Sequence, residues 1–268
     1  MALNGAALTL MGGRRRGGAN NFFGDLQSLG LDTGLVRCVD AGAAESYPGT
    51  GQTWADLSPA GNDLYLGSSS GADAADQAFT GTAGEVGPDT YFSSDGGDYF
   101  VEAAAVMTDW HKNNGLFSVA ALIYYTGSNT IIVSSQGSVS QGVRLAIVSG
   151  ILRLQCYNGS GLALDAQHPG TPTPNAWNFV AVGEDEAAET CRLCLNGANS
   201  SVAGTYTSPS ASNPAIAMGA VGALNNGFLL APAGTRFARL AMWDGVALSA
   251  ADLSAIYAKQ AELFTTLP

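Results

Sequence analysis

Carboxylates are the first side chains in this chain of 268 residues whose types and spacing could do chemistry. Four acids stand close together, namely Glu184, Asp185, Glu186 and Glu189. Two carboxylates that converge across one bond can hydrolyse a glycosidic linkage. On a β-strand such a pair takes alternate positions, because adjacent side chains diverge. The cluster lacks that alternation and separates two apolar runs, so the sequence predicts a solvated hairpin loop from Gly183 to Glu189 and no catalytic residue.

Cysteine spacing offers a second candidate, because Cys191 and Cys194 match the C-x-x-C pattern of metal and redox sites. Residues three apart on a strand project to opposite faces, so these two sulfurs cannot converge on one ion. Cys38 and Cys156 also lie in apolar strand contexts. The sequence therefore predicts four free, buried thiols.

Histidine chemistry has no supporting motif. His111 and His168 are the two histidines, and neither accompanies a nucleophile elbow. P-loop, dinucleotide-binding and EF-hand patterns are also absent from the sequence. We therefore expect a protein that is not an enzyme.

Calcium is the metal that the loop residues could hold, because a hard cation takes several oxygen ligands. The candidate ligands are Asp56, Asn62, Asp63, Asp95 and Asp98. Their spacing matches no recognised calcium loop, and Asp and Asn are also the residues that form turns. We expect turn-forming roles and no cofactor, with Ca²⁺ as the alternative.

Sugar binding requires an exposed aromatic ring beside amide or carboxylate groups. The best candidates are Trp110, His111 and Asn113 in one stretch, and Tyr157 with Asn158 in another. The other three tryptophans, Trp54, Trp177 and Trp243, stand in strand patterns and are predicted to be core residues.

The elements that would position these residues are strands. The stretch from Pro174 to Gly197 reads as a β-hairpin whose two arms alternate with period two and are apolar on both faces. Ser149-Gly150 predicts a two-residue turn between two further strands. Ser249 and Asp252 form a capping-box pattern, which predicts a helix over residues 249–264.

Three stretches resemble one family. Trp177–Ala181 (WNFVA) with Leu193–Gly197 (LCLNG), Val36–Leu57 followed by a turn to Asn62, and Arg236–Tyr257 occur in the right order. They resemble the laminin-G-like, concanavalin-A-like domains of bacteriophage structural proteins. The resemblance implies an all-β fold, an antiparallel two-sheet jelly-roll sandwich over residues 31–268 that includes the C-terminal helix.

Composition agrees with many short strands, since the chain is 46% apolar, 12% charged and contains 35 glycines. The net charge of −11 argues against a nucleic-acid partner. No apolar run approaches the length of a membrane span, and the apolar run Ala6–Met11 precedes the arginines, the reverse of the order in a signal peptide.

Residues 1–30 differ from the rest. Arg14, Arg15 and Arg16 lie between glycine pairs, and Phe22 and Phe23 follow. Such a basic, glycine-rich stretch orders poorly by itself. We expect an extended arm that docks onto a larger assembly, the alternative being an N-terminus that covers an edge of its own domain.

The resemblance and the arm together predict a bacteriophage virion protein made in the host cytoplasm: a head or tail fibre, spike or decoration subunit. Its partners would be capsid, portal or tail proteins and two further copies in a homotrimer, with host-surface polysaccharide as a candidate ligand. The alternatives are a free lectin-like carbohydrate-binding module and a glycoside hydrolase or lyase on the same fold.

Overall fold

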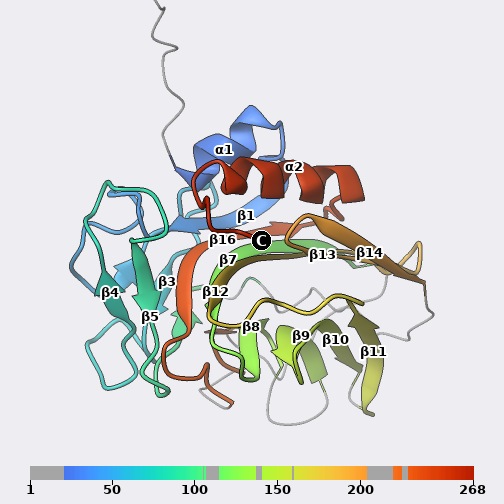
Figure 1. Cartoon of the computed structure of the whole chain (residues 1–268). Coiled ribbons are helices and arrows are strands. Elements are labelled where there is room, and N and C mark those ends of the chain that lie inside the picture. The colour runs from blue at the N-terminus through green and yellow to red at the C-terminus, as the bar shows by residue number, and fades with distance from the viewer. Residues whose placement is uncertain are drawn as a thin grey trace, which may run out of the picture.

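The computed structural model describes residues 21–104, 106, 115–136, 141–158, 160–203, 220–224 and 229–268. These residues form two antiparallel β-sheets packed face to face, with two helices on the outer side of one of them (Figure 1). The architecture is the predicted jelly-roll β-sandwich.

Sheet A, which carries the helices, contains eight strands. Along the sheet these are β14 (Ala198–Ala203), β13 (Thr190–Leu195), β12 (Ala176–Asp185), β7 (Leu116–Tyr125), β16 (Arg236–Asp244), β5 (Tyr91–Ser93) and β4 (Ala78–Thr80), with β1 (Leu35–Asp40) also paired to β16.

Sheet B also contains eight strands. Their order is β11 (Leu162–Gln167), β10 (Ile151–Asn158), β9 (Gln141–Val148), β8 (Thr130–Ser134), β15 (Ala220–Val221), β6 (Phe100–Glu102), β3 (Leu64–Leu66) and β2 (Thr53–Trp54).

The main core lies between the two sheets. At one end it is aromatic: the rings of Trp54 and Phe100 have centroids 4.9 Å apart, and Phe92 lies against both. A buried ion pair also joins the sheets here, because Arg37 of β1 lies 2.6 Å from Glu102 of β6 and both side chains are fully buried. Buried charges require such pairing.

A second core lies on the outer face of sheet A, beneath α1 (Phe22–Ser28) and α2 (Ala250–Ala261). Strands β7, β12 and β16 are apolar on both faces, so the sheet needs cover on its outer side as well. Trp177 and Trp243 point into this second core, and Trp54 points into the main one, as predicted.

The N-terminal boundary of the body differs from the prediction. Phe22 is 1% exposed in the second core, and Phe23 is half-buried against it. Helix α1 forms because Asn21 caps it, its side chain accepting the Gly24 amide at 2.9 Å. The expectation that both phenylalanines belong to an exposed arm is therefore corrected: residues 21–30 pack onto the body. Arg14, Arg15 and Arg16 lie outside the described residues.

A buried ionic network fixes both helices to the sheet. Arg239 of β16 lies 2.9 Å from Asp25 of α1 and 2.9 Å from Asp40 of β1, and it donates a hydrogen bond to the Gln260 side chain of α2. Asp40 also accepts the backbone amide of Phe22 at 2.9 Å. One arginine thus holds a helix from each end of the chain against sheet A.

Local turn and cap predictions are confirmed. Ser149 and Gly150, both with positive φ, form the two-residue turn between β9 and β10. Ser249 and Asp252 make both hydrogen bonds of a capping box at the start of α2. Neither described helix is long and apolar enough to cross a membrane.

The predicted hairpin is present, but its loop is shorter than expected. Strand β12 continues to Asp185, which pairs with Thr190, so Gly183 and Glu184 belong to the strand. Glu184 follows Val180 and Val182 at alternate positions facing the main core, and it is 1% exposed. The prediction of a solvated loop is therefore wrong for these two residues, because strand pairing continues past the last apolar side chain.

The four cysteines are free and buried, as predicted. Cys191 faces the main core and Cys194 faces the second core, so the C-x-x-C pair is divided between the two faces of sheet A. Burial raises the pKa of the Cys194 thiol to about 11. Burial, and secondarily the Glu184 carboxylate, also raises the pKa of Cys191. These are packing residues, since reactive cysteines have lowered pKa values.

Candidate functional site

The outer face of sheet B differs from that of sheet A, because both described helices lie on the opposite side of the molecule (Figure 1). Loops cover the outer face at the β15–β6 end, where Tyr99 packs with Ala220 and Ala223. The end made by β8, β9 and β10 carries a mixture of polar and aromatic side chains instead. This end is the candidate functional site.

Strand alternation selects which side chains reach this face. On β10, Leu152, Leu154 and Cys156 point into the main core. The intervening residues Gln155 and Tyr157 therefore point outward.

The turn at Ser149-Gly150 determines the partners across the strands. It places Ile151 opposite Val148, and by the same register Gln155 lies opposite Arg144. Nε of Arg144 donates to Oε1 of Gln155 at 2.6 Å. Its guanidinium carbon also lies 5.4 Å from the centroid of the half-exposed Tyr157 ring, within range of a cation–π contact. Two neighbours thus orient the guanidinium.

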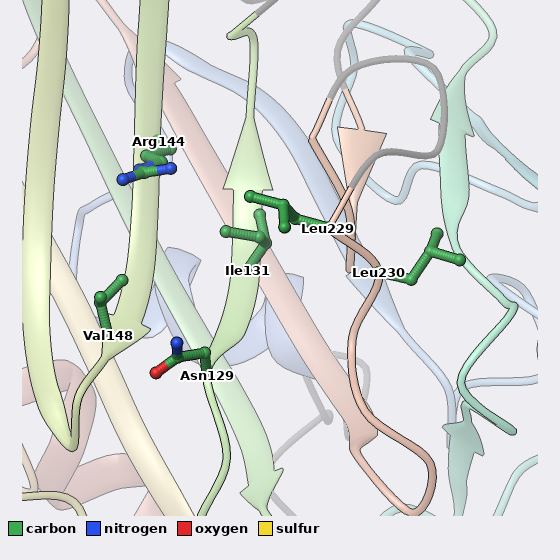
Figure 2. A pocket seen from close by; sticks show the side chains of 6 residues that line it. All are labelled: Asn129, Ile131, Arg144, Val148, Leu229 and Leu230. Atoms are coloured by element: carbon green, nitrogen blue, oxygen red, sulfur yellow. The ribbon is translucent and has the colours of Figure 1, made fainter.

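A cavity of about 180 Å³ adjoins this cluster. Figure 2 shows its lining: Asn129, Ile131, Arg144, Val148, Leu229 and Leu230. In that view Arg144 and Asn129 lie at opposite ends, with Ile131 and Val148 between them. The cavity therefore combines apolar walls with a cationic group at one end and an amide at the other, the usual composition of a small-molecule site.

Leu229 is unusual among the lining residues. It is 64% exposed, and its φ of 49° lies in the left-handed region. That conformation costs a leucine roughly 1–2 kcal/mol, and an exposed leucine gains little from packing. Strained residues of this kind concentrate at functional sites.

A separate ion pair lies beside the cluster on the same face. Arg153 of β10 contacts Asp165 of β11 at 2.9 Å, and Gln167 donates to the same carboxylate at 2.7 Å. Both charges of the pair are partly exposed, so its contribution to stability is small. The cavity does not include these residues.

Of the residues predicted to bind sugar, Tyr157 and Asn158 lie on this face or at its edge. Asn158 ends β10, and its side chain accepts the Ser160 amide at 3.0 Å, which is a turn contact. Trp110, His111 and Asn113 lie outside the described residues. Sequence reasoning missed Arg144, Gln155 and the cavity residues. The two-residue turn would have placed Arg144 opposite Gln155, had its register been extended along both strands.

The predicted calcium candidates are engaged in turns. The Asp56 carboxylate accepts backbone amides from Cys38, Ser58 and Asn62 at 2.7–2.8 Å. Oδ1 of Asp63 accepts the Asp56 amide at 2.8 Å. The Asp56 oxygens are therefore oriented toward the chain's own backbone.

The second pair of calcium candidates shows the same pattern. Asp98 accepts the Asp95 amide, and Asp95 accepts the Gly97 amide, each at 2.8 Å. Burial, followed by the negative charges of neighbouring aspartates, raises the pKa of Asp98. Across the described residues no group of acids, histidines or cysteines is arranged to hold a metal ion.

The four acids considered first do not converge. Glu184 is buried in β12, whereas Asp185 accepts the Ala188 amide at 2.9 Å within the turn. The backbone amide of Glu189 donates to the Glu186 carbonyl at 3.1 Å, which closes the same turn.

No protein-family model matches the chain, and no curated protein matches it either. Among solved structures, the chain is similar to the binding domain of botulinum neurotoxin serotype G, with a TM-score of 0.58 and 12% identity over 85% of this chain and 51% of that one. It is similar to the binding domain of botulinum neurotoxin DC in complex with SialylT, with a TM-score of 0.56 and 10% identity over 85% and 52%.

A third similar structure is titled for the dependence of botulinum neurotoxin type C cell entry on two ganglioside molecules. Its TM-score is 0.55 at 12% identity over 87% of this chain and 53% of that one. The chain thus spans about half the length of the solved structures that it matches. At these identities the likeness shows the fold, a jelly-roll β-sandwich.

Proposed function

We propose that this chain is a non-catalytic carbohydrate-binding β-sandwich whose ligand lies on the outer face of β8, β9 and β10. One observation carries the proposal: a half-exposed tyrosine, Tyr157, lies beside an arginine fixed by a hydrogen bond to Gln155, next to a cavity of about 180 Å³. A sugar presents apolar C–H faces and polar hydroxyls, so it needs an aromatic surface together with fixed hydrogen-bonding groups.

Binding is favoured over hydrolysis by the charges on this face. Asp165 is the described carboxylate closest in sheet register to the cluster, and Arg153 and Gln167 both engage it. Hydrolysis of a glycosidic bond would require two carboxylates about 5–10 Å apart across the sugar. The similar structures are binding domains by title, and two of their titles name SialylT and gangliosides. They support the proposal through the shared fold alone.

A glycan array tests the proposal. Wild-type protein, Tyr157→Ala and Tyr65→Ala are applied to purified bacterial-surface and animal glycans. Tyr65 is the matched control, because it is also a half-buried tyrosine of sheet B but lies on β3, at the far end of the sheet. We expect Y157A to lower affinity for the bound glycan about tenfold or more and Y65A to leave it unchanged. Equal losses in both variants, or no glycan bound by the wild type, would refute the proposal.

We propose in addition that the chain is a bacteriophage virion component, displayed by its N-terminal arm. Helix α1 begins on the outer side of sheet A, whereas the candidate site lies on the outer side of sheet B (Figure 1). Residues 1–20, with Arg14, Arg15 and Arg16, precede that helix in the chain. An anchor attached at this point would leave the binding face directed away from the particle.

Mass spectrometry of density-gradient-purified particles tests the virion role. Peptides of this chain should co-sediment with the major capsid protein at a constant ratio, and a homotrimer predicts a copy number divisible by three. Absence from purified particles would refute this role and leave a free lectin-like module. Deleting residues 1–20 should abolish incorporation while glycan binding persists.

A further inference from the structure

Arg144 is the arginine of the candidate site, and its pairing differs from that of other arginines. Arg37, Arg153 and Arg239 each contact a carboxylate. In the part of the chain that the structure describes, Arg144 contacts a neutral amide and an aromatic ring instead. The whole chain has 22 acidic residues and 11 lysines and arginines, so an arginine without an acidic partner is notable. Its charge is available to a ligand.

The geometry of Arg144 suits a carboxylate. Nε is already used by Gln155, which leaves the two terminal nitrogens for other acceptors. A guanidinium presents its donors as a planar fork that can bind both oxygens of one carboxylate. Because Gln155 and Tyr157 already restrict the side chain, binding would cost little additional conformational entropy.

The cavity beside Arg144 sets the size of the ligand. Sites for drug-sized ligands measure about 300–1,000 Å³, so about 180 Å³ accommodates one sugar unit rather than an oligosaccharide. Its walls near the guanidinium are the aliphatic side chains of Ile131, Val148 and Leu229. These side chains suit a methyl-bearing substituent, such as an acetamido or deoxy group, better than a hydroxyl.

We infer that the cavity binds an acidic sugar unit, a uronic or nonulosonic acid, whose carboxylate pairs with Arg144 and whose apolar substituent lies against Leu229 and Ile131. This inference rests on the proposed function, because it names the class of glycan that the outer face of sheet B recognises. It goes further in making the ligand's charge, and not its hydroxyl pattern alone, the basis of selectivity.

The test compares acidic polysaccharides with their own neutral derivatives. The probes are hyaluronan, alginate, polygalacturonate and polysialic acid, each beside its carboxyl-reduced product, together with neutral dextran and mannan. At least one acidic probe should bind, and its reduced product should bind about tenfold or more weakly, as expected for a lost charge-assisted hydrogen bond. Arg144→Gln should abolish this preference, and Arg144→Lys should restore part of it.

Arg153→Gln is the matched control, because it removes the same charge from the same face outside the cavity. It should keep the preference for the acidic probe. Thermal melting of each variant shows that it is folded.

The outcomes separate the inference from the function on which it rests. Equal affinity for an acidic probe and its reduced product, or binding of neutral probes alone, would overturn the acidic ligand while carbohydrate binding stands. Equal losses in R144Q and R153Q would show general attraction by positive charge and would also overturn it. Failure of the wild type to bind any acidic or neutral probe would refute carbohydrate binding itself.

Discussion

Arg239 offers the clearest test of how the two terminal helices are held. Its side chain is 0% exposed, and its partners Asp25 and Asp40 are 12% and 2% exposed. Arg239→Met removes the charge and keeps a similar length, so two carboxylates lose their cation in a medium of low polarity. Removing one partner of a buried ion pair costs about 3–5 kcal/mol.

The structure places the expected loss at the lower end of that range. Asp40 would keep the amides of Phe22 and Gly42, each at 2.9 Å. The Nη2 contact with Asp40, although 2.9 Å long, also lacks the alignment of a hydrogen bond, so less is lost there. We expect Arg239→Met to lower the free energy of unfolding by about 3 kcal/mol near pH 7.

The pH dependence gives the same prediction a second, independent readout. Burial raises the pKa of Asp25 in the folded protein, and Arg239 opposes that rise. Without Arg239 the folded-state pKa of Asp25 should be higher still. A carboxyl whose pKa is higher in the folded than in the unfolded state favours folding as the pH falls through the folded-state value. The deficit of the variant should therefore shrink as the pH is lowered.

Urea denaturation followed by tryptophan fluorescence, near pH 7 and about pH 5, measures both effects as the difference between variant and wild type. Combining Arg239→Met with Asp25→Asn and Asp40→Asn should recover most of the loss, because no carboxylate then lacks its cation. A loss below about 1 kcal/mol, or a loss equal at the two pH values, would refute a role for this network in holding the helices.

Three further predictions follow from the fold and the site. Deleting residues 1–20 should leave the thermal unfolding temperature unchanged, whereas deleting residues 1–30 removes buried Phe22 and should cost about 3–5 kcal/mol or more; equal effects in calorimetry would contradict the boundary. Leu229→Asn relieves a positive φ, so urea denaturation should show unchanged or slightly higher stability, while titration calorimetry shows weaker glycan binding. Cys194, whose pKa is raised to about 11, should resist a thiol reagent near pH 8 until denaturant is added; rapid labelling of the native protein would contradict its burial.

Sequence reasoning predicted the fold well where local signals agreed with packing. Trp177 and Trp243 stand in alternating runs that are apolar on both faces, and such runs belong to a strand covered on both sides. The capping box at Ser249 and the turn at Ser149 depend on neighbouring residues alone, so their outcome does not depend on distant parts of the chain.

The charged residues of the interior were beyond such reasoning. Glu184 and Arg239 resemble solvent-facing residues in the sequence, because their burial depends on strands that pair from distant parts of the chain. Phe22 was assigned to an exposed arm for the same reason: the surface that covers it is made by β16 and α2, more than two hundred residues later. Local pattern indicates what a segment becomes but not what covers it.

The candidate site falls between these cases. Tyr157 was found from its residue type, whereas Arg144 requires the register of β9 against β10. The cavity could not be predicted, because Leu229 reaches it from a part of the chain distant from both strands.

The unequal burial of the two sheets has an evolutionary consequence. Substitutions on either face of sheet A alter a core, so their acceptance is limited by stability. Outward positions of β9 and β10, such as Arg144 and Gln155, belong to neither core. Mutations there can change which ligand is recognised at little cost to folding. Descendants of this chain could therefore follow a changing target by altering a few residues of one sheet, while the rest of the sandwich is preserved.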